Sequence, residues 1–395
     1  MGNETKIIEK FREIVGKDNV LSEGCDLLAY STDASGIFGE ARIVLFPKYN
    51  EDVRKIVRYA LRTGLNVVPR GAGTGLVGGA VPDNSVVLDF SRMRRIMVLN
   101  RKEMTVVVEP GVVLTELNKE LAKHGLFFPI VPSSQKVCTI GGMIATNAAG
   151  YRAIRYGKTA DWIEQLEIVD GSGKLFTFNG KNDFIGSEGV LGIITKAKLK
   201  LTRAPVMSSM DFNGYESIHD LVTDVRNILQ TPGVLGIEYF DRIVAGMLGL
   251  KDMNYLIVEY EDDQGEIQDP DEILRKIDLR ENIAPIVASK GYQIYEDPKI
   301  ELEKMDHFIE WLQKNNTPSF GHIGIGIIHP QFRKGQEKLV SRMFEEVMRL
   351  GGQVSGEHGI GLAKKKYADP SYKANIKRLK QKYDPSNVLN KGKIL

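Results

Sequence analysis

Four side chains able to bind a metal or move a proton stand in two short glycine-rich segments of the last third of the chain. The segment GHIGIGIIHP holds His322 and His329, and the segment SGEHGIG holds Glu357 and His358. The chain has six histidines, and three of them lie here. Two imidazoles and one carboxylate are a common ligand set for a divalent metal, and a fourth titratable group stands beside them in the sequence. The pattern therefore favours chemistry over packing.

A plainer role is also open to these histidines, because imidazoles often do no more than satisfy buried backbone groups. The clustering of three histidines with an adjacent carboxylate favours a metal site. His322 and His329 are an odd number of residues apart, however, so an unbroken strand would point them to opposite faces of a sheet. We therefore predict that a turn or bulge near Gly324 or Gly326 brings them together.

The composition is that of an ordinary soluble protein. The chain has 395 residues, a length that predicts two or three domains. Hydrophobic residues make up 42% and charged residues 26%, and the net charge of +2 gives no reason to expect binding to nucleic acid.

Cys25 and Cys138 lie in no CxxC motif, which excludes a cysteine-ligated iron–sulfur cluster within the chain and argues against a disulfide scaffold. No apolar run approaches the ~20 residues of a membrane span. The first residues lack the apolar core of a signal peptide, so we expect a cytoplasmic location.

A β-α-β unit near the N-terminus leads into a long glycine-rich loop. We predict a strand over residues 41–46, a helix over residues 51–63 capped by Asn50, and a short strand over residues 66–69. The loop that follows is PRGAGTGLVGGAVP, which has five glycines. Such a loop exposes consecutive backbone N–H groups, which form a nest for an anion such as phosphate or pyrophosphate.

Two better-known phosphate motifs do not fit this loop. Gly73, Gly75 and Gly78 spell GxGxxG, but the dinucleotide fingerprint needs a helix to begin there. We predict no helix, because Pro82 follows and residues 85–90 are another strand. The loop also lacks the Gly-Lys-Ser/Thr ending of an ATP-binding P-loop. A flexible surface turn is the alternative, and the buried strands predicted on both sides favour a ligand loop.

Further along the chain, two more segments are rich in small residues. Residues 132–159 leave the backbone open to close approach by a flat ligand, although close packing of a helix on a sheet would need the same composition. A hairpin around Asp170 precedes the segment GSEGVLGIITKAKLKL. We predict a boundary at Pro205, since the density of glycine falls after it. The remaining pattern is α+β, with helices over residues 300–314 and 336–350.

These motifs resemble those of a known family. PRGAGTGLVGGAVP, PSSQKVCTIGG, RYGKT and GSEGVLGIIT resemble the FAD domain of the p-cresol methylhydroxylase and vanillyl-alcohol oxidase superfamily. GHIGIGIIHP, SGEHGIG and the tail DPSNVLNKGK resemble its D-2-hydroxyacid dehydrogenases, which include D-lactate dehydrogenase and the FAD subunit of glycolate oxidase. The resemblance implies an α+β fold. It has a two-subdomain FAD-binding domain over residues 1–204, a shortened α+β cap over residues 205–354, and a C-terminal segment over residues 355–395 that returns to the FAD site.

The resemblance also implies which residues contact FAD. Covalent members of the superfamily often carry a histidine in the first loop, where this chain has Thr74 and Gly75, so the FAD is expected to be non-covalent. Carried over position by position, the FAD contacts fall in four segments. They are Arg70, Gly71, Ala72, Gly73, Thr74, Gly75, Gly78 and Gly79; Ser134, Thr139, Gly141, Gly142, Ala145 and Asn147; Glu188 and Ile193; and Asn390.

In this family the histidine-rich segments have defined roles. His322, His329 and Glu357 would hold a divalent metal, zinc or manganese, and His358 would be the catalytic base. A D-2-hydroxy acid of the lactate or glycolate type would chelate the metal. The metal lowers the pKa of the substrate hydroxyl, so that a neutral His358 can take its proton while hydride passes from C2 to flavin N5.

The chain departs from its relatives close to these ligands. Relatives usually read HIGDGNLH in the first metal segment, but here Ile325 and Ile327 replace the Asp and the Asn, and Gln331 replaces a further asparagine. Loss of polar groups around a metal predicts weaker metal binding or altered specificity. The arginine that holds the substrate carboxylate in relatives has no counterpart that we can place, and the corresponding lysine falls at Tyr295, with Lys299 nearby.

Two other functions share most of these motifs. A metal-free flavoenzyme of the alkyl-dihydroxyacetone-phosphate synthase type would use the same fold, but such enzymes tend to have histidine where Glu357 stands. The other is a FAD subunit of a larger redox complex. The chain shows no NAD motif and no iron–sulfur ligands, so electrons would leave to a separate acceptor: an electron-transfer protein, a quinone or oxygen. A homo-oligomer or a complex with a redox partner subunit is consistent with this.

Overall fold

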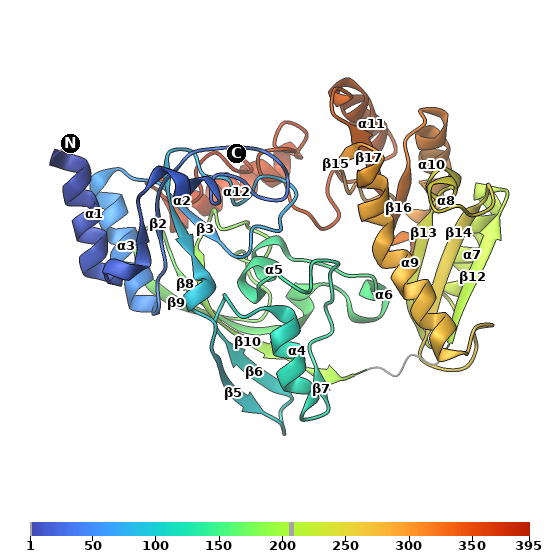
Figure 1. Cartoon of the computed structure of the whole chain (residues 1–395), viewed down its shortest axis with the longest axis horizontal. Helices are drawn as coiled ribbons and strands as arrows, with labels where there is room; N and C mark the ends of the chain where they lie inside the picture. Colours follow the sequence, from blue (N-terminus) through green and yellow to red (C-terminus); the bar gives the residue numbers. More distant parts are fainter. Residues whose placement is uncertain (1, 205–208) are drawn as a thin grey trace. The chain divides into compact units, whose positions relative to one another are not determined.

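The chain folds into two compact units. The computed structural model describes residues 2–204 and 209–395. Unit 1 comprises residues 1–148, 158–204 and 358–395, and unit 2 comprises residues 149–157 and 205–357. The chain therefore passes from unit 1 into unit 2 and back twice (Figure 1). Pro205, which we predicted as a boundary, lies outside the described residues.

A four-stranded sheet that is buried on both faces forms the first part of unit 1. Its strands, in spatial order, are β1 (Val20–Leu21), β2 (Ala41–Leu45), β4 (Ser85–Asp89) and β3 (Val67–Arg70), and the last three are parallel. Helices α1 (Gly2–Val15) and α3 (Asn50–Thr63) lie side by side on one face (Figure 1). There Phe11 and Ile56 share a core with Ile43 of the sheet. Val44 and Val87 pack on the other face with Leu27 of α2 (Gly24–Leu28). Burial on both sides explains why β2 and β4 read as continuous apolar runs.

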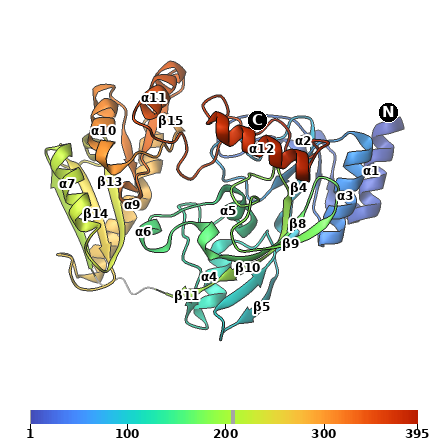
Figure 2. The same ribbon diagram turned by 180° about the vertical axis from the view of Figure 1, so that it is seen from behind.

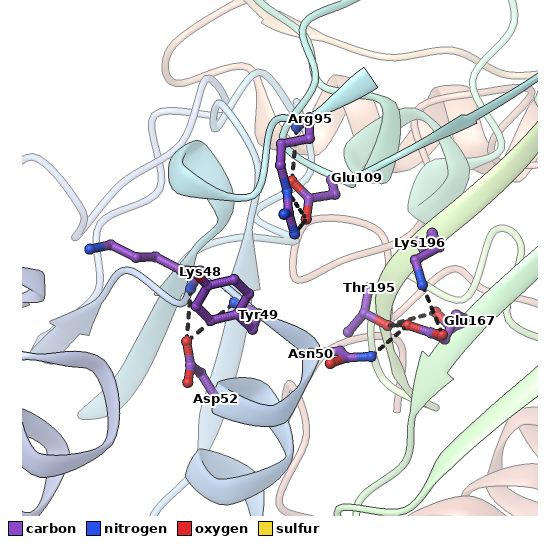
Figure 3. Close-up of polar contacts among 9 residues, drawn as sticks. All are labelled: Lys48, Tyr49, Asn50, Asp52, Arg95, Glu109, Glu167, Thr195 and Lys196. Carbon is purple, nitrogen blue, oxygen red and sulfur yellow. Dashed lines mark hydrogen bonds and ion pairs between the residues drawn. The ribbon is translucent and has the colours of Figure 1, made fainter. Parts of the chain in front are cut away.

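Helix α3 begins one residue earlier than predicted, and Asn50 is not its cap. The cap position is Tyr49, and the Asp52 carboxylate accepts hydrogen bonds from the backbone N–H groups of Lys48 at 3.0 Å and Tyr49 at 3.2 Å. The Asn50 amide instead donates to the Glu167 carboxylate at 3.0 Å (Figure 3). The prediction was wrong because the best acceptor for Asn50 lies more than a hundred residues away in sequence.

A five-stranded antiparallel sheet forms the second part of unit 1. Its strands, in spatial order, are β5 (Ile96–Asn100), β6 (Thr105–Val108), β10 (Ile193–Lys200), β8 (Ile163–Val169) and β9 (Leu175–Asn179). The predicted hairpin around Asp170 is confirmed as β8 and β9. Glu167 of β8 also accepts hydrogen bonds from the Thr195 hydroxyl at 3.0 Å and the Lys196 ammonium at 3.2 Å (Figure 3). One carboxylate thus ties α3 to two strands of the second sheet.

The other elements of unit 1 are short or lie beside the sheets. They are η1 (Lys17–Asn19), η2 (Phe90–Arg92), α4 (Leu114–Ala122), β7 (Leu126–Phe127), α5 (Ile140–Thr146), η3 (Thr159–Trp162), β11 (Thr202–Arg203) and α12 (Pro370–Tyr383). Figure 2 shows α12, in red, close to the N-terminal half of unit 1, although the two are far apart in the sequence. The bridge between Val67 and Leu389 fixes this return of the chain.

A buried ion pair anchors the end of α12. The Lys380 ammonium donates to the Asp384 carboxylate at 2.8 Å and to the carbonyl oxygens of Val190 at 2.9 Å and Leu389 at 2.6 Å. Asp384 in turn accepts from the backbone N–H groups of Val388 and Leu389. The tail is therefore held by a fully hydrogen-bonded pair of charges.

We expect Lys380→Met to lower the free energy of unfolding of unit 1 by about 3–5 kcal/mol, because it leaves the Asp384 carboxylate buried without its cation. Urea unfolding of the FAD-loaded protein, followed by flavin release and circular dichroism, measures the change. Lys377→Met on the exposed side of the same helix is the control and should stay within about 0.5 kcal/mol of the wild type. Equal losses for the two variants would contradict the anchoring role.

Unit 2 is built on a six-stranded antiparallel sheet. Its strands, in spatial order, are β12 (Ser209–Tyr215), β14 (Asn254–Tyr260), β13 (Val234–Phe240), β16 (Ser319–Gly321), β17 (His329–Arg333) and β15 (Tyr292–Tyr295). Its helices are α6 (Ala153–Tyr156), α7 (Ile218–Ile228), α8 (Arg242–Met247), α9 (Pro270–Ser289), η4 (Leu302–Lys304), α10 (Met305–Lys314), η5 (Ile323–Ile325) and α11 (Glu337–Arg349). The two helices predicted over residues 300–314 and 336–350 are confirmed as α10, after the short turn η4, and α11.

One face of this sheet changes from apolar to charged along its length. Phe240, Tyr255 and Ile257 pack with α8 and α9 in a buried core. Alternation along β13 and β14 places Glu238 and Glu259 on the same face. The apolar core therefore ends at two buried carboxylates, and the candidate metal ligands lie at that end.

Two negative findings concern the described residues. No helix or strand forms between β3 and β4, so the expectation that GxGxxG opens no helix is confirmed. Within residues 2–204 and 209–395, no helix combines the length and apolarity needed to cross a bilayer.

Candidate metal centre and FAD-binding loops

Three of the four predicted FAD-contact segments meet through glycines that leave no room for a side chain. A Cβ on Gly71 would overlap the Thr139 hydroxyl and lie 3.8 Å from the Gly142 Cα. A Cβ on Gly189 would lie 2.5 Å from Pro69 Cγ. The first loop therefore contacts both the second and the third segment through its backbone. The fold uses these glycines for close approach.

The tail residue Asn390 joins the first and third segments. Its buried amide donates to the Gly79 carbonyl at 2.9 Å and to the Glu188 carbonyl at 2.7 Å. The backbone N–H of Glu188 donates to the Ala145 carbonyl at 2.8 Å, which brings in the second segment. All four predicted segments are thus held together within unit 1.

Several predicted FAD residues also have structural partners within unit 1. The Arg70 guanidinium donates to the backbone carbonyl of Thr32 at 2.7 Å, and the side-chain Oδ1 atom of Asn147 accepts from the backbone N–H of Ala160 at 2.9 Å. Gly73 and Gly78 adopt positive φ values of 68° and 76°, which the loop conformation requires.

The remaining predicted FAD residues take different positions. Thr139 precedes α5 and accepts from the Gly142 N–H. Ile193 lies in the apolar core. In the first loop Ala72 is exposed, and Thr74 and Gly75 are partly exposed. The Ser134 carbonyl accepts from the N–H groups of Val137 and Cys138. Gly141 packs so closely on Pro110 that a Cβ would lie 2.6 Å from Pro110 Cβ.

The Glu188 carboxylate forms hydrogen bonds with backbone groups of the chain. It accepts hydrogen bonds from the backbone N–H groups of Ile360 at 2.7 Å and Gly361 at 2.9 Å, within the SGEHGIG segment. The second half of that segment is therefore fixed to unit 1. His358 begins this last part of unit 1, directly after Glu357, which is the last residue of unit 2.

The three predicted metal ligands converge in unit 2. One ligand atom from each of His322, His329 and Glu357 lies within 4.8 Å of the other two. Glu357 Oε1 is 3.3 Å from His329 Nε2 and 3.8 Å from His322 Nε2. The two imidazole rings are perpendicular, with centroids 5.3 Å apart. Two imidazole nitrogens and a carboxylate oxygen in one small space fit the donor set of a catalytic zinc or a related divalent metal.

A turn brings the two histidines together, as predicted. β16 ends at Gly321, η5 follows over Ile323–Ile325, and Gly326 ends η5 in the left-handed conformation at φ 77°. β16 and β17 then pair so that Phe320 is opposite His329. A Cβ on Gly321 would lie 2.6 Å from the Ile327 carbonyl and 3.2 Å from His329 Cδ2, so glycine is required beside the ligand.

Glu238 of β13 holds the first histidine. Its Oε1 atom lies 2.6 Å from His322 Nδ1, and both side chains are largely buried. Burial alone would lower the pKa of His322, but the charge and hydrogen bond of Glu238, together with the charge of Glu357, raise the pKa to about 9. With Nδ1 facing Glu238, the other ring nitrogen, Nε2, is directed at Glu357.

Asp297, which is fully buried, holds the segment that carries the third ligand. Its Oδ2 atom accepts from the backbone N–H of Glu357 at 2.7 Å, the N–H of Gly356 at 3.0 Å and the Ser355 hydroxyl at 2.9 Å. Sequence reasoning missed both Glu238 and Asp297. For Glu238 a signal existed, because it is the only charged residue in the otherwise apolar strand VLGIEYF.

The residues that depart from the family pattern lie close to these ligands. Ile327 is buried, and a Cβ on Gly356 would lie 2.5 Å from its Cγ1 atom, so Ile327 packs beneath the segment that carries Glu357. Gln331 lies two residues after His329 in β17 and is fully buried. Neither the Nε2 nor the Oε1 atom of the Gln331 side chain has a hydrogen-bond partner among the described residues.

Comparison with known proteins decides the family. One family profile, described as FAD binding domain, matches residues 41–179, and a second, described as FAD linked oxidases, C-terminal domain, matches residues 250–394. A D-2-hydroxyglutarate dehydrogenase of Xanthomonas citri is 30% identical, over 89% of this chain and 88% of that protein. The chain belongs to the FAD-linked oxidases. It is an FAD-linked oxidoreductase, and the predicted family, fold class and FAD cofactor are confirmed.

Other relatives of this FAD-linked oxidase carry related names. The protein named glycolate oxidase subunit GlcD of Bacillus subtilis is 29% identical over 98% of this chain and 96% of its own length. A D-lactate dehydrogenase of Anaerostipes hadrus is 26% identical over 98% and 97%.

Solved structures are similar in fold. A p-cresol methylhydroxylase has a TM-score of 0.79 at 14% identity, covering 99% of this chain and 96% of that one. An alkyldihydroxyacetonephosphate synthase has a TM-score of 0.71 at 16% identity, covering 98% and 84%.

Proposed function

We propose that this FAD-linked oxidase oxidises a D-2-hydroxy acid of the lactate, glycolate or 2-hydroxyglutarate type, with a divalent metal that holds the substrate. The observation that carries the proposal is the convergence of His322, His329 and Glu357 on one small space. The names of the relatives support the substrate class. The carboxylate in the ligand set favours this reaction over that of a metal-free synthase on the same fold.

Within unit 1, the backbone of the first loop would hold the FAD pyrophosphate. Gly73 and Gly78 adopt positive φ values, a conformation from which anion nests of backbone N–H groups are built. The second and third segments and Asn390 would complete the site, since the structure joins all four segments. No histidine stands in this loop, which favours non-covalent binding.

Within unit 2, His322 and His329 would each offer Nε2 and Glu357 one oxygen to zinc or manganese. When bound, the metal supplies a Lewis acid that acidifies the substrate hydroxyl, and FAD supplies the hydride acceptor. Glu238 keeps His322 Nε2 directed at the metal position. Asp297 keeps the backbone of Glu357 in place.

His358 would take the hydroxyl proton as the catalytic base. It is bonded directly to the metal ligand Glu357, at the point where the chain passes from unit 2 to unit 1. A base joined by one peptide bond to a ligand stays within reach of a substrate on the metal, because consecutive Cα atoms are about 3.8 Å apart. The electrons would then leave FAD for a separate acceptor.

Anaerobic flavin reduction tests the proposal. The purified yellow protein is mixed with D-lactate, L-lactate, glycolate or D-2-hydroxyglutarate, with and without a chelator, and the flavin absorbance is followed. We expect at least one D-acid or glycolate to bleach the flavin, L-lactate to be much slower, and prior chelation to suppress the reaction. If dithionite bleaches the flavin but none of the acids does, the substrate class is wrong. If chelation has no effect, the metal role is wrong.

A further inference from the structure

We propose that Glu238 is the positioning residue of the metal site: it fixes the orientation and tautomer of His322 and thereby sets the affinity for the metal. The inference rests on the proposed function, because it concerns the same ligand set. Glu238 itself does not bind the metal in this proposal; it acts through His322.

The first observation is that the Glu238 carboxylate is buried, which costs free energy unless the charge is compensated. All seven residues of β13 are buried, and Glu238 is the only charged one. An ionised carboxylate taken out of water costs several kcal/mol unless a partner compensates. Its hydrogen-bond partner is His322 Nδ1 at 2.6 Å. Because this buried carboxylate forms its hydrogen bond with a candidate metal ligand, we infer that it orients His322.

The second observation is the direction of the imidazole. A neutral imidazole that donates Nδ1–H to a carboxylate carries the lone pair that binds a metal on its other nitrogen, Nε2. In His322 this nitrogen faces Glu357 Oε1 at 3.8 Å, the oxygen that also lies 3.3 Å from His329 Nε2. Without Glu238 the ring could rotate or exchange tautomers, and it would have to be ordered when the metal binds.

The third observation is that the backbone places Glu238 for this contact. β13 pairs with β16 so that Tyr239 is opposite Gly321, and the next residue in each direction is Glu238 in β13 and His322 directly after β16. The chain then leaves the sheet through η5, where a Cβ on Gly324 would overlap Ile154 Cδ1 and lie 3.2 Å from Ile237 Cβ. The turn is therefore packed tightly against β13 and cannot carry His322 away from Glu238.

A nearby acid provides a matched comparison. Glu259 of β14 lies on the same face of the same sheet and is also buried, with 2% of its surface exposed against 8% for Glu238. Its carboxylate pairs with Arg280 at 2.5 Å and Arg152 at 2.9 Å. Both carboxylates are thus buried, and they differ in their hydrogen-bond partners.

The test is the metal affinity of Glu238→Leu, Glu238→Gln and Glu259→Gln, measured by competition with a chromophoric chelator for zinc. We expect Glu238→Leu to weaken zinc binding about 100-fold and Glu238→Gln about 10-fold, because glutamine keeps the acceptor and loses the charge. Glu259→Gln should stay within about threefold of the wild type. The visible spectrum of the cobalt-loaded protein should change in Glu238→Leu and be unchanged in Glu259→Gln.

A second readout separates positioning from general stability. If Glu238 acts through the metal, saturating zinc should restore flavin reduction in Glu238→Leu, and FAD content and thermal unfolding should match those of Glu259→Gln. Unchanged zinc affinity in Glu238→Leu would overturn the inference. A wild-type protein that takes up no divalent metal would overturn the proposed metal role itself, so the two failures are distinguishable.

Discussion

Glu357→Gln should remove the metal from the protein and leave its FAD in place. Glutamine offers a neutral carbonyl oxygen where the two imidazoles need a charged third ligand, so metal affinity falls steeply. We expect kcat/KM for the D-2-hydroxy acid to fall at least a thousand-fold, equivalent to about 4 kcal/mol of transition-state stabilisation. His329→Ala should have an effect of the same size, because it removes another ligand of the same set.

Elemental analysis and flavin absorbance of the purified variants measure the two losses separately. Glu266→Gln, which changes an exposed acid of unit 2, is the control and should keep both metal and activity. A Glu357→Gln variant that retains stoichiometric metal and wild-type flavin reduction would contradict the ligand assignment. A variant that loses FAD as well would indicate a general folding defect.

Gly71→Ala should produce a protein that is largely colourless as purified. The added Cβ would overlap the Thr139 hydroxyl at the start of α5, so the first loop must move away from the second segment. Because both segments are proposed to contact FAD, we expect the dissociation constant for FAD to rise at least 30-fold, about 2 kcal/mol. Flavin titration of the apoprotein measures the change, and metal content should be unaffected.

The matched control for this loop is Gly24→Ala in α2. A Cβ on Gly24 meets nothing within 4 Å, so FAD affinity and stability should be those of the wild type. If Gly71→Ala binds FAD as tightly as Gly24→Ala, the loop is not part of the FAD site.

Much of this arrangement could be predicted from the sequence because it follows local patterns. The apolar spacing of α3, the strands on either side of the glycine-rich loop and the helices α10 and α11 depend mainly on residues close in sequence. The break between His322 and His329 was also predictable, since strand alternation alone would separate them. Glycine-rich motifs then indicated the family.

The features that escaped prediction all depend on distant partners. Asn50 pairs with Glu167 rather than capping its helix, and Lys380 pairs with groups of the third segment and the tail. Glu238 and Asp297 hold ligands that lie 84 and 60 residues further along the chain. Contacts of this kind are set by how the sheets and loops assemble, and no short pattern in the sequence contains them.

The most direct test of the account is the rate of flavin reduction in enzyme that carries FAD but has been stripped of metal. We expect a D-2-hydroxy acid to reduce this flavin at least a hundred-fold more slowly than in the untreated enzyme, and added zinc or manganese to restore the rate. Equal rates before and after stripping, with metal removal verified by elemental analysis, would contradict a reaction that depends on His322, His329 and Glu357.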